Sequence, residues 1–239
     1  MRIPRRSSLL VPMLALLAAG ESSAKRKEFT DSFMLETCRF AARGTNPYFI
    51  LTPGYRLILE SEPSRRRKDE HVVLVVTVLD ETEEVAGVTT RVVEERETAD
   101  GRLVEISRNF FALCEQNNSV VYFGEDVDNY DETGTTVVNH DGGWRAGVNG
   151  ARPGVLVPGL ALVGARYYQE IAPDVALDRA EIVSVSEVVT TPSGTFQGCL
   201  KTKETTPLER RSKSFKSYAP GIGLIRDDDL VLTSFGSAN

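Results

Sequence analysis

The sequence predicts a mainly β protein in which one large antiparallel sheet curves into a half barrel or a closed barrel. Runs of strand-forming residues follow one another from Tyr55 almost to the end of the chain. Two of these runs, 83–98 and 190–207, have the alternation and the central glycine that are typical of hairpins. No segment of helical length separates the runs, which excludes the crossovers that parallel strands require.

Length and composition are those of a folded domain. The chain has 239 residues, of which 41% are hydrophobic and 26% charged. This is enough to bury a core in one large all-β domain or two small ones. The formal charge of -6 argues against a nucleic-acid surface, because phosphate binding needs clustered Lys and Arg. We therefore expect no nucleic-acid partner.

Residues 1–24 have the pattern of a signal peptide. A basic start, "MRIPRR", precedes an apolar stretch that is too short to span a bilayer, and Ser22 and Ala24 are the small residues that a signal peptidase requires. Glu21 occupies the position where a lipoprotein would have cysteine. We expect cleavage after Ala24 and a secreted or periplasmic mature protein without a membrane span.

Three cysteines in an exported protein predict one disulfide and one remaining thiol. Cys114 and Cys199 lie in or at the end of strand-like runs, whereas Cys38 lies in a separate N-terminal segment. We predict a Cys114–Cys199 bridge. The alternative is that all three are small buried hydrophobic residues.

The segment 25–45 is predicted to be helical, with an extended chain as the alternative. Phe29, Phe33, Cys38 and Ala41 fall roughly on one helical face, and Gly44 can end the helix. Residues 46–239 then form a single β domain.

The predicted strands come in two sets that follow the same order. The first set comprises 70–81, 87–98, 102–116 and 119–127, and the second comprises 179–189, 194–206, 210–219 and 223–232. If Gly87 is aligned with Gly194 at a constant offset, the two hairpins coincide. We interpret this as two meander repeats, about 50–126 and 155–235. The alternative is that two hairpins share alternation by chance.

The connection 125–159 is rich in glycine and proline and is predicted to be a long functional loop. Its acidic residues Asp126, Asp128 and Asp131 are candidate calcium ligands, because calcium prefers oxygen ligands at short spacing. Tyr130, however, stands where an EF-hand loop has an oxygen ligand. A solvated acidic turn is the favoured alternative.

No zinc-ligand spacing, HExxH motif or GxSxG motif is present. We therefore expect no enzyme activity and no cofactor other than calcium. Four aromatic residues are candidates for lining a cavity on the concave face of the sheet, where an apolar or lipid-like ligand would bind. They are Tyr122, Phe123, Trp144 and Tyr168. An ordinary aromatic core is the alternative.

Four stretches together resemble a family of uncharacterised exported bacterial β-rich proteins. They are "TNPYFILTPG", "YFGEDVDNY", "TTPSGTFQGCLKTKETTPLE" and "YAPGIGLI", and the resemblance runs from about Asn46 to Asp229. This chain departs from the family pattern after "LTPG", where it has Tyr55 and Arg56. The resemblance implies a large antiparallel sheet distantly similar to lipoprotein carriers, in which a curved sheet can hold an acyl chain. It implies no catalytic residue.

Taken together, these features predict an exported, non-enzymatic binding protein for an apolar or lipid-like molecule. The alternative is a structural or adhesive module of the cell envelope, stabilised by calcium at the acidic loop. A hydrolase with clustered carboxylates of raised pKa in a cleft is the third hypothesis.

Overall fold

The structure, a computed structural model, describes residues 28–62 and 70–237. The predicted signal peptide and its cleavage site lie outside the described residues. Within these two ranges, no helix is long and apolar enough to cross a membrane.

In the described residues, a path of 13 hydrogen-bonded antiparallel strands curves into a nearly closed barrel, which confirms the predicted fold class. Their order around the sheet is β12 (Arg166–Tyr168), β14 (Arg179–Thr191), β15 (Gly194–Thr205), β16 (Ser214–Ala219), β17 (Gly223–Asp227), β18 (Leu230–Ser237), β4 (Tyr55–Ser61), β5 (Val72–Val85), β6 (Val88–Ala99), β7 (Arg102–Cys114), β8 (Ser119–Tyr130), β11 (Arg152–Val157) and β13 (Glu170–Ile171). The short elements are η1 (Leu35–Thr37), β1 (Phe40–Ala41), β2 (Thr45–Asn46), β3 (Phe49–Ile50), β9 (Val137–Asn139) and β10 (Trp144–Arg145).

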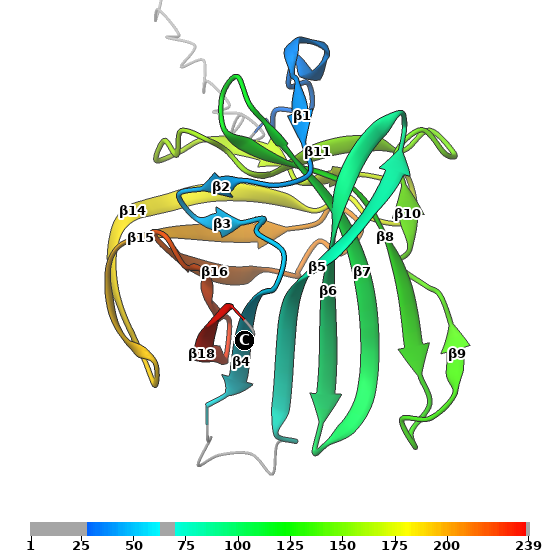
Figure 1. Ribbon diagram of the computed structural model, residues 1–239, viewed down its shortest axis with the longest axis vertical. Coiled ribbons are helices and arrows are strands. Elements are labelled where there is room, and N and C mark those ends of the chain that lie inside the picture. Colours follow the sequence, from blue (N-terminus) through cyan, green and yellow to red (C-terminus); the bar gives the residue numbers. More distant parts are fainter. Residues whose placement is uncertain (1–27, 63–69, 238–239) are drawn as a thin grey trace, which may run out of the picture.

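The two halves of the chain form opposite walls. In Figure 1, β5 to β8 run along the long axis of the molecule, while β14 to β16 run across it. The long hairpins β5–β6 and β14–β15, one in each half, begin at equivalent positions when Gly87 is aligned with Gly194. A repeat origin for the two halves stays a prediction.

A single short segment, residues 166–171, closes the barrel. Its first part, β12, pairs with β14, and its second part, β13, pairs with β11; only Gln169 separates the two strands. A Cβ on Gly154 of β11 would lie 2.4 Å from the Gln169 carbonyl, so this close approach requires glycine. Part of the connection predicted to be an irregular loop is therefore β11, the strand that pairs with β8 and with the closing segment.

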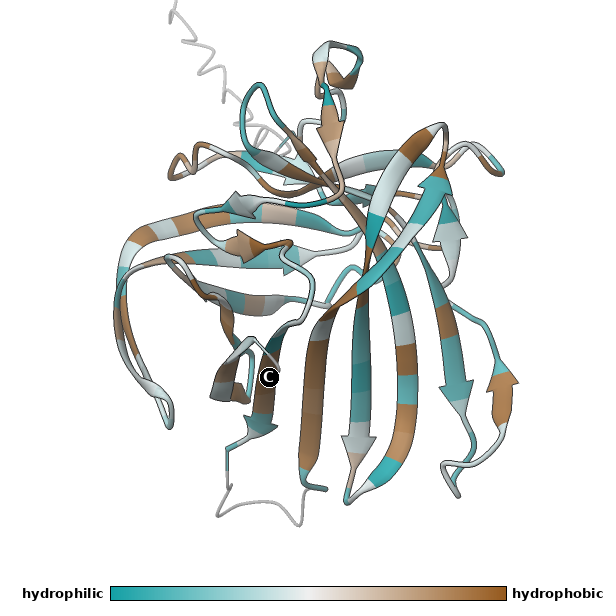
Figure 2. Ribbon diagram, in the orientation of Figure 1, coloured by the Kyte–Doolittle hydropathy of each residue, from teal (hydrophilic) through white to brown (hydrophobic). Residues whose placement is uncertain are grey.

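Apolar and polar stretches lie side by side in the sheet. Figure 2 shows that the first half of β5 is almost continuously hydrophobic, whereas the adjoining part of β6 is mostly hydrophilic. The register places Val76 opposite Glu95. Directly opposed residues share a face of the sheet, so the same face receives an apolar side chain from β5 and a carboxyl group from β6.

The buried guanidinium of Arg91 holds the ladder between β5 and β6 together where its register shifts. Arg91 is 5% exposed and donates hydrogen bonds to the carbonyl oxygens of Ala42 at 2.7 Å, Leu79 at 3.2 Å and Glu81 at 3.2 Å. Leu79 and Glu81 lie within the irregularity, where the ladder gives them no cross-strand partner. The same side chain thereby attaches the N-terminal segment to the sheet.

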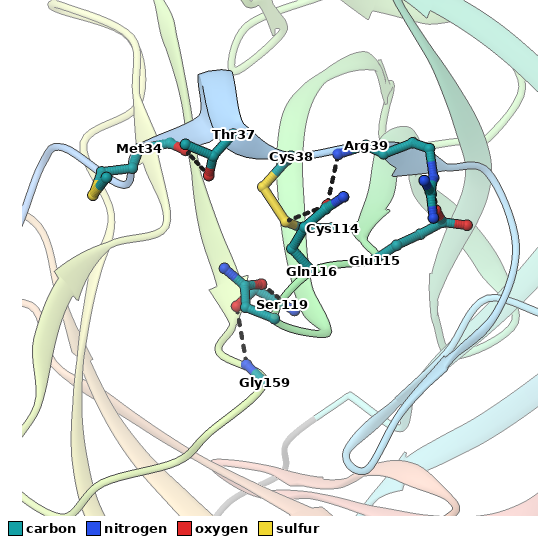
Figure 3. Close-up of a disulfide and its surroundings, with 10 residues drawn as sticks. Met34, Thr37, Cys38, Arg39, Cys114, Glu115, Gln116, Ser119 and Gly159 are labelled. Atoms are coloured by element: carbon teal, nitrogen blue, oxygen red, sulfur yellow. Dashed lines mark hydrogen bonds and ion pairs between the residues drawn. A yellow bond between two sulfur atoms is a disulfide. The ribbon is translucent and has the colours of Figure 1, made fainter.

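The disulfide joins Cys38 to Cys114, and Cys199 is a buried free thiol, so the predicted Cys114–Cys199 bridge is wrong. The reason is the pairing of β1 with the end of β7, which brings the N-terminal segment beside Cys114. Figure 3 shows Arg39 next to the bridge, where its backbone N–H donates to Gln116 at 2.7 Å and its side chain pairs with Glu115.

The predicted N-terminal helix is also wrong, because the described part of this segment, residues 28–45, forms only the short 3-10 turn η1 as helical structure. The barrel offers backbone partners to this segment: Thr30 donates to the Arg166 carbonyl and accepts from the Tyr168 N–H, both at 2.9 Å. Phe29 packs edge-to-face on Tyr168, with ring centroids 6.2 Å apart. The apolar spacing that suggested a helical face therefore reflects separate contacts of an extended chain.

Removing the disulfide should lower stability strongly. The bridge closes a loop across a sequence separation of 76 residues, so Cys38→Ala is expected to lower the free energy of unfolding by about 4 kcal/mol. Urea unfolding measures this loss. As a control, Cys199→Ala keeps the bridge and should cost about 1 kcal/mol through lost packing. Equal losses in the two variants would contradict the assigned pairing.

Candidate ligand cavity

A cavity of about 230 Å³ lies inside the barrel, between its two walls. The apolar part of its lining includes Leu57, Val76, Val78, Val93, Leu156 and Leu224. The ionisable part consists of Glu95, Glu105, Glu125, Glu170, Asp178, Glu204 and Lys216. The cavity is therefore amphipathic, with apolar and acidic regions in one chamber.

The strand register explains this division. Two cross-strand rows run from β4 or β5 to β7 or β8 on the inner face, and each changes from apolar to polar along its length. The first row is Leu57, Val76, Glu95 and Ser107, and the second is Val78, Val93, Asn109 and Glu125. Because opposed side chains lie on one face, carboxyl groups are in contact range of the apolar wall.

Burial raises the pKa of several carboxyl groups at this wall. Desolvation, reinforced by the nearby charge of Glu95, raises the pKa of Glu125 to about 8. Desolvation likewise raises the pKa of Glu95 and raises that of Glu170 well above its usual range. Glu170 accepts a hydrogen bond from the indole N–H of Trp144 at 2.7 Å. Several acids therefore share one poorly solvated space.

Lys216 is the one cationic side chain among the described residues that line the cavity. Its ammonium lies 3.5 Å from a carboxylate oxygen of Glu204 and 3.4 Å from one of Asp227. The attraction of Glu204, more than that of Asp227, raises the pKa of Lys216 well above its usual value. Glu204 also accepts hydrogen bonds from Gln169 at 3.1 Å and Thr202 at 3.2 Å. The charge of Lys216 is thus already neutralised by protein carboxylates.

Three polar side chains of the lining have no hydrogen-bond partner within the described part of the chain: Glu95, Glu105 and Tyr218. Tyr218 is only 4% exposed, and burial raises the pKa of its hydroxyl. In contrast, the Tyr122 hydroxyl donates to Asn109 at 2.5 Å. All three side chains therefore offer polar groups to the cavity that the described residues do not pair.

The acidic end of the cavity leads to a second hollow of about 380 Å³. The two spaces share Glu125, Glu170, Asp178 and Glu204. The second hollow is bounded by the loop around 205–214 and by Gly142.

Of the four aromatic residues predicted to bind a ligand, Tyr122 lines the cavity. Phe123 points to the other side of β8 and packs against Phe40, with ring centroids 5.2 Å apart. Trp144 packs edge-to-face against Tyr122, with ring centroids 5.3 Å apart. Tyr168 packs against the N-terminal segment.

The inner carboxyl groups were missed by the sequence reasoning. Their signal was a row of charged residues, Glu94 to Glu97, inside an otherwise clear strand. Charges at four consecutive positions must place some of them on the inner face, because side chains alternate along a strand.

The predicted calcium ligands do not come together. Asp126 pairs with Arg145 at 3.0 Å, and Asp128 lies 2.9 Å from His140. Asp131 accepts hydrogen bonds within its own turn, and the Thr133 hydroxyl is the main reason that its pKa falls to about 2. In the described ranges, no three His, Cys, Asp or Glu side chains are grouped so as to hold a metal ion.

No protein-family model matches the chain, and no curated protein matches it. Two solved structures are similar. One is a protein of Bacteroides fragilis NCTC 9343, described as exported and with a YmcC-like fold, with 18% identity and a TM-score of 0.41. The other, described as a lipoprotein, is from Parabacteroides distasonis ATCC 8503, with 17% identity and a TM-score of 0.34. Both comparisons cover 81% of this chain and 100% of the other.

Stability should depend on pH through the inner carboxyl groups. The pKa of Glu125 is raised from its ordinary 4.5 to about 8. The folded state therefore holds a proton that the unfolded state releases, and stability falls as pH rises from about 4.5 to about 8. Glu125→Gln should remove part of this fall and be more stable than wild type at pH 8 by about 2 kcal/mol.

Urea unfolding between pH 5 and 9 measures this effect. The control is Glu84→Gln at the exposed β5–β6 hairpin, which should follow the wild-type curve. A Glu125→Gln variant with the wild-type pH dependence would show that Glu125 is ionised and solvated in the folded state.

Proposed function

We propose that this is an exported, non-enzymatic binding protein that holds a small amphipathic molecule inside its barrel. The observation that supports this most strongly is the cavity of about 230 Å³ with one apolar region and one acidic region. For comparison, a dry apolar cavity of roughly 150 Å³ is large enough to bind benzene. Export is supported by the signal-peptide pattern of residues 1–24.

A structural or adhesive envelope module is disfavoured by the same cavity. Such a module gains most from a filled interior, because unfilled space forfeits dispersion contacts. Buried carboxyl groups without hydrogen bonds lower its stability further. A barrel that keeps both features is better explained by a ligand that occupies the space and satisfies the polar groups.

Hydrolysis is the second candidate, because clustered carboxyl groups with raised pKa, such as Glu125 and Glu170, are typical of acid–base sites. The apolar wall directly beside them suits a hydrocarbon better than the hydroxyl groups of a sugar. Release of p-nitrophenol from p-nitrophenyl glycosides by the wild type, but not by Glu125→Gln, would replace the binding proposal with this candidate.

A neutral apolar probe should bind inside the barrel. N-phenyl-1-naphthylamine, whose fluorescence rises in apolar surroundings, is expected to bind with 1:1 stoichiometry. Leu156→Phe fills part of the apolar region and should weaken binding about tenfold or more, because overpacked space cannot admit the probe. Fluorescence titration measures both the stoichiometry and the affinity.

Val188→Phe is the matched control, since Val188 is 63% exposed on β14. It should bind the probe as the wild type does, and thermal melting should show that both variants fold. Non-saturable binding, or equal binding by both variants, would contradict an internal site.

A further inference from the structure

The cavity has an excess of acidic groups that its own residues do not balance. Among the described residues, six carboxyl groups and one ammonium line it. The ammonium of Lys216 is already paired with Glu204 and Asp227, and it also exerts a weaker electrostatic attraction on Glu95. Any further positive charge must come from a ligand, because no other cationic side chain of the described residues lines this space.

The polar groups of the lining that lack a hydrogen-bond partner define where that charge would lie. Glu95 and Glu105 are acceptors when ionised, and neither makes a hydrogen bond to a described residue. The Tyr218 hydroxyl, on a residue that is 4% exposed and lines the same cavity, is also without a partner. Two acceptors and a hydroxyl suit a group with several N–H donors, such as a primary ammonium.

A metal ion fits this arrangement less well. In the described parts of the chain, no three potential ligands are grouped at metal-binding geometry. Moreover, Glu95 lies opposite Val76 in the sheet, so an apolar surface begins immediately beside the carboxyl group. The occupant should therefore have a hydrocarbon part attached to its charged group.

We propose that the ligand is an amphipathic amine whose ammonium group lies between Glu95, Glu105 and Tyr218 and whose hydrocarbon part lies against the wall formed by Val76, Val93 and Leu156. This assignment rests on the proposed binding function and specifies its ligand class. The charge-assisted hydrogen bonds fix the head of the ligand, and the apolar wall accounts for its tail.

Three eight-carbon ligands separate the head group from the tail. Octylamine, 1-octanol and octanoate are used to displace N-phenyl-1-naphthylamine from the full mature protein at pH 7. Octylamine is expected to bind at least about tenfold more tightly than 1-octanol, and octanoate more weakly than either, because the acidic groups repel its carboxylate. The single tryptophan, Trp144, which is hydrogen-bonded to Glu170, gives an independent fluorescence readout.

Variants test the position of the ammonium group. Glu95→Gln and Glu105→Gln should each weaken octylamine binding about tenfold while leaving 1-octanol binding unchanged, since the loss of a charge-assisted hydrogen bond affects only the cation. Glu94→Gln is the control, because Glu94 is the neighbour of Glu95 on β6 and pairs with Arg108 at 3.9 Å instead of lining the cavity. Thermal melting establishes that all three variants fold.

The outcomes separate the two proposals. Equal affinities for the three ligands would overturn the amine assignment and leave the cavity as a site for neutral amphiphiles. Octylamine binding that Glu95→Gln and Glu105→Gln do not weaken would overturn the position of the head group. Failure of the naphthylamine probe and of all three ligands to bind would instead overturn the binding function itself.

Discussion

The closure of the barrel by residues 166–171 is the constraint on which the rest of the structure depends. The two ends of the sheet, β12 and β13, are joined by one residue, Gln169, so the ends cannot separate without breaking a ladder with β14 or β11. Closure gives every long strand an inner and an outer face. It also brings Gln169 and Glu170, from the closing segment, into the cavity lining opposite β6 and β7. The cavity is therefore a consequence of how the sheet ends meet.

The carboxyl groups inside the barrel lower the stability of the folded state. Removing a carboxylate from water without a paired partner is unfavourable, and the raised pKa of Glu125 reflects that cost. Natural proteins bury carboxyl groups without paired partners mainly at functional sites. Here four of the groups, Glu125, Glu170, Asp178 and Glu204, also line a second hollow next to the cavity.

Much of the fold could be predicted from sequence, because local pattern determines it. Alternation, turn residues and the absence of crossovers are properties of neighbouring residues, and they indicated the curved antiparallel sheet. The strand β11 was not recognised, since Pro153 and Gly154 are unfavourable in strands generally. Its glycine is needed for the approach of Gln169, which is a long-range contact.

The site was harder to predict because it also depends on contacts between strands that are far apart in the sequence. Glu94 and Glu95 look alike in the sequence, and only the register of β6 against β5 and β7 places Glu95 inside. The disulfide likewise depends on where β1 joins β7, which the spacing of the cysteines does not show. The free Cys199 lies on β15, in the opposite half of the barrel.

The most direct test of the central claim is a crystal structure of the protein with 8-bromooctylamine, located by the anomalous signal of bromine. We expect one bromine position inside the barrel near Leu156 and Val78, with the amine nitrogen within hydrogen-bond distance of Glu95 or Glu105. A bromine on the outer surface, or an interior without the ligand at saturating concentration, would contradict it.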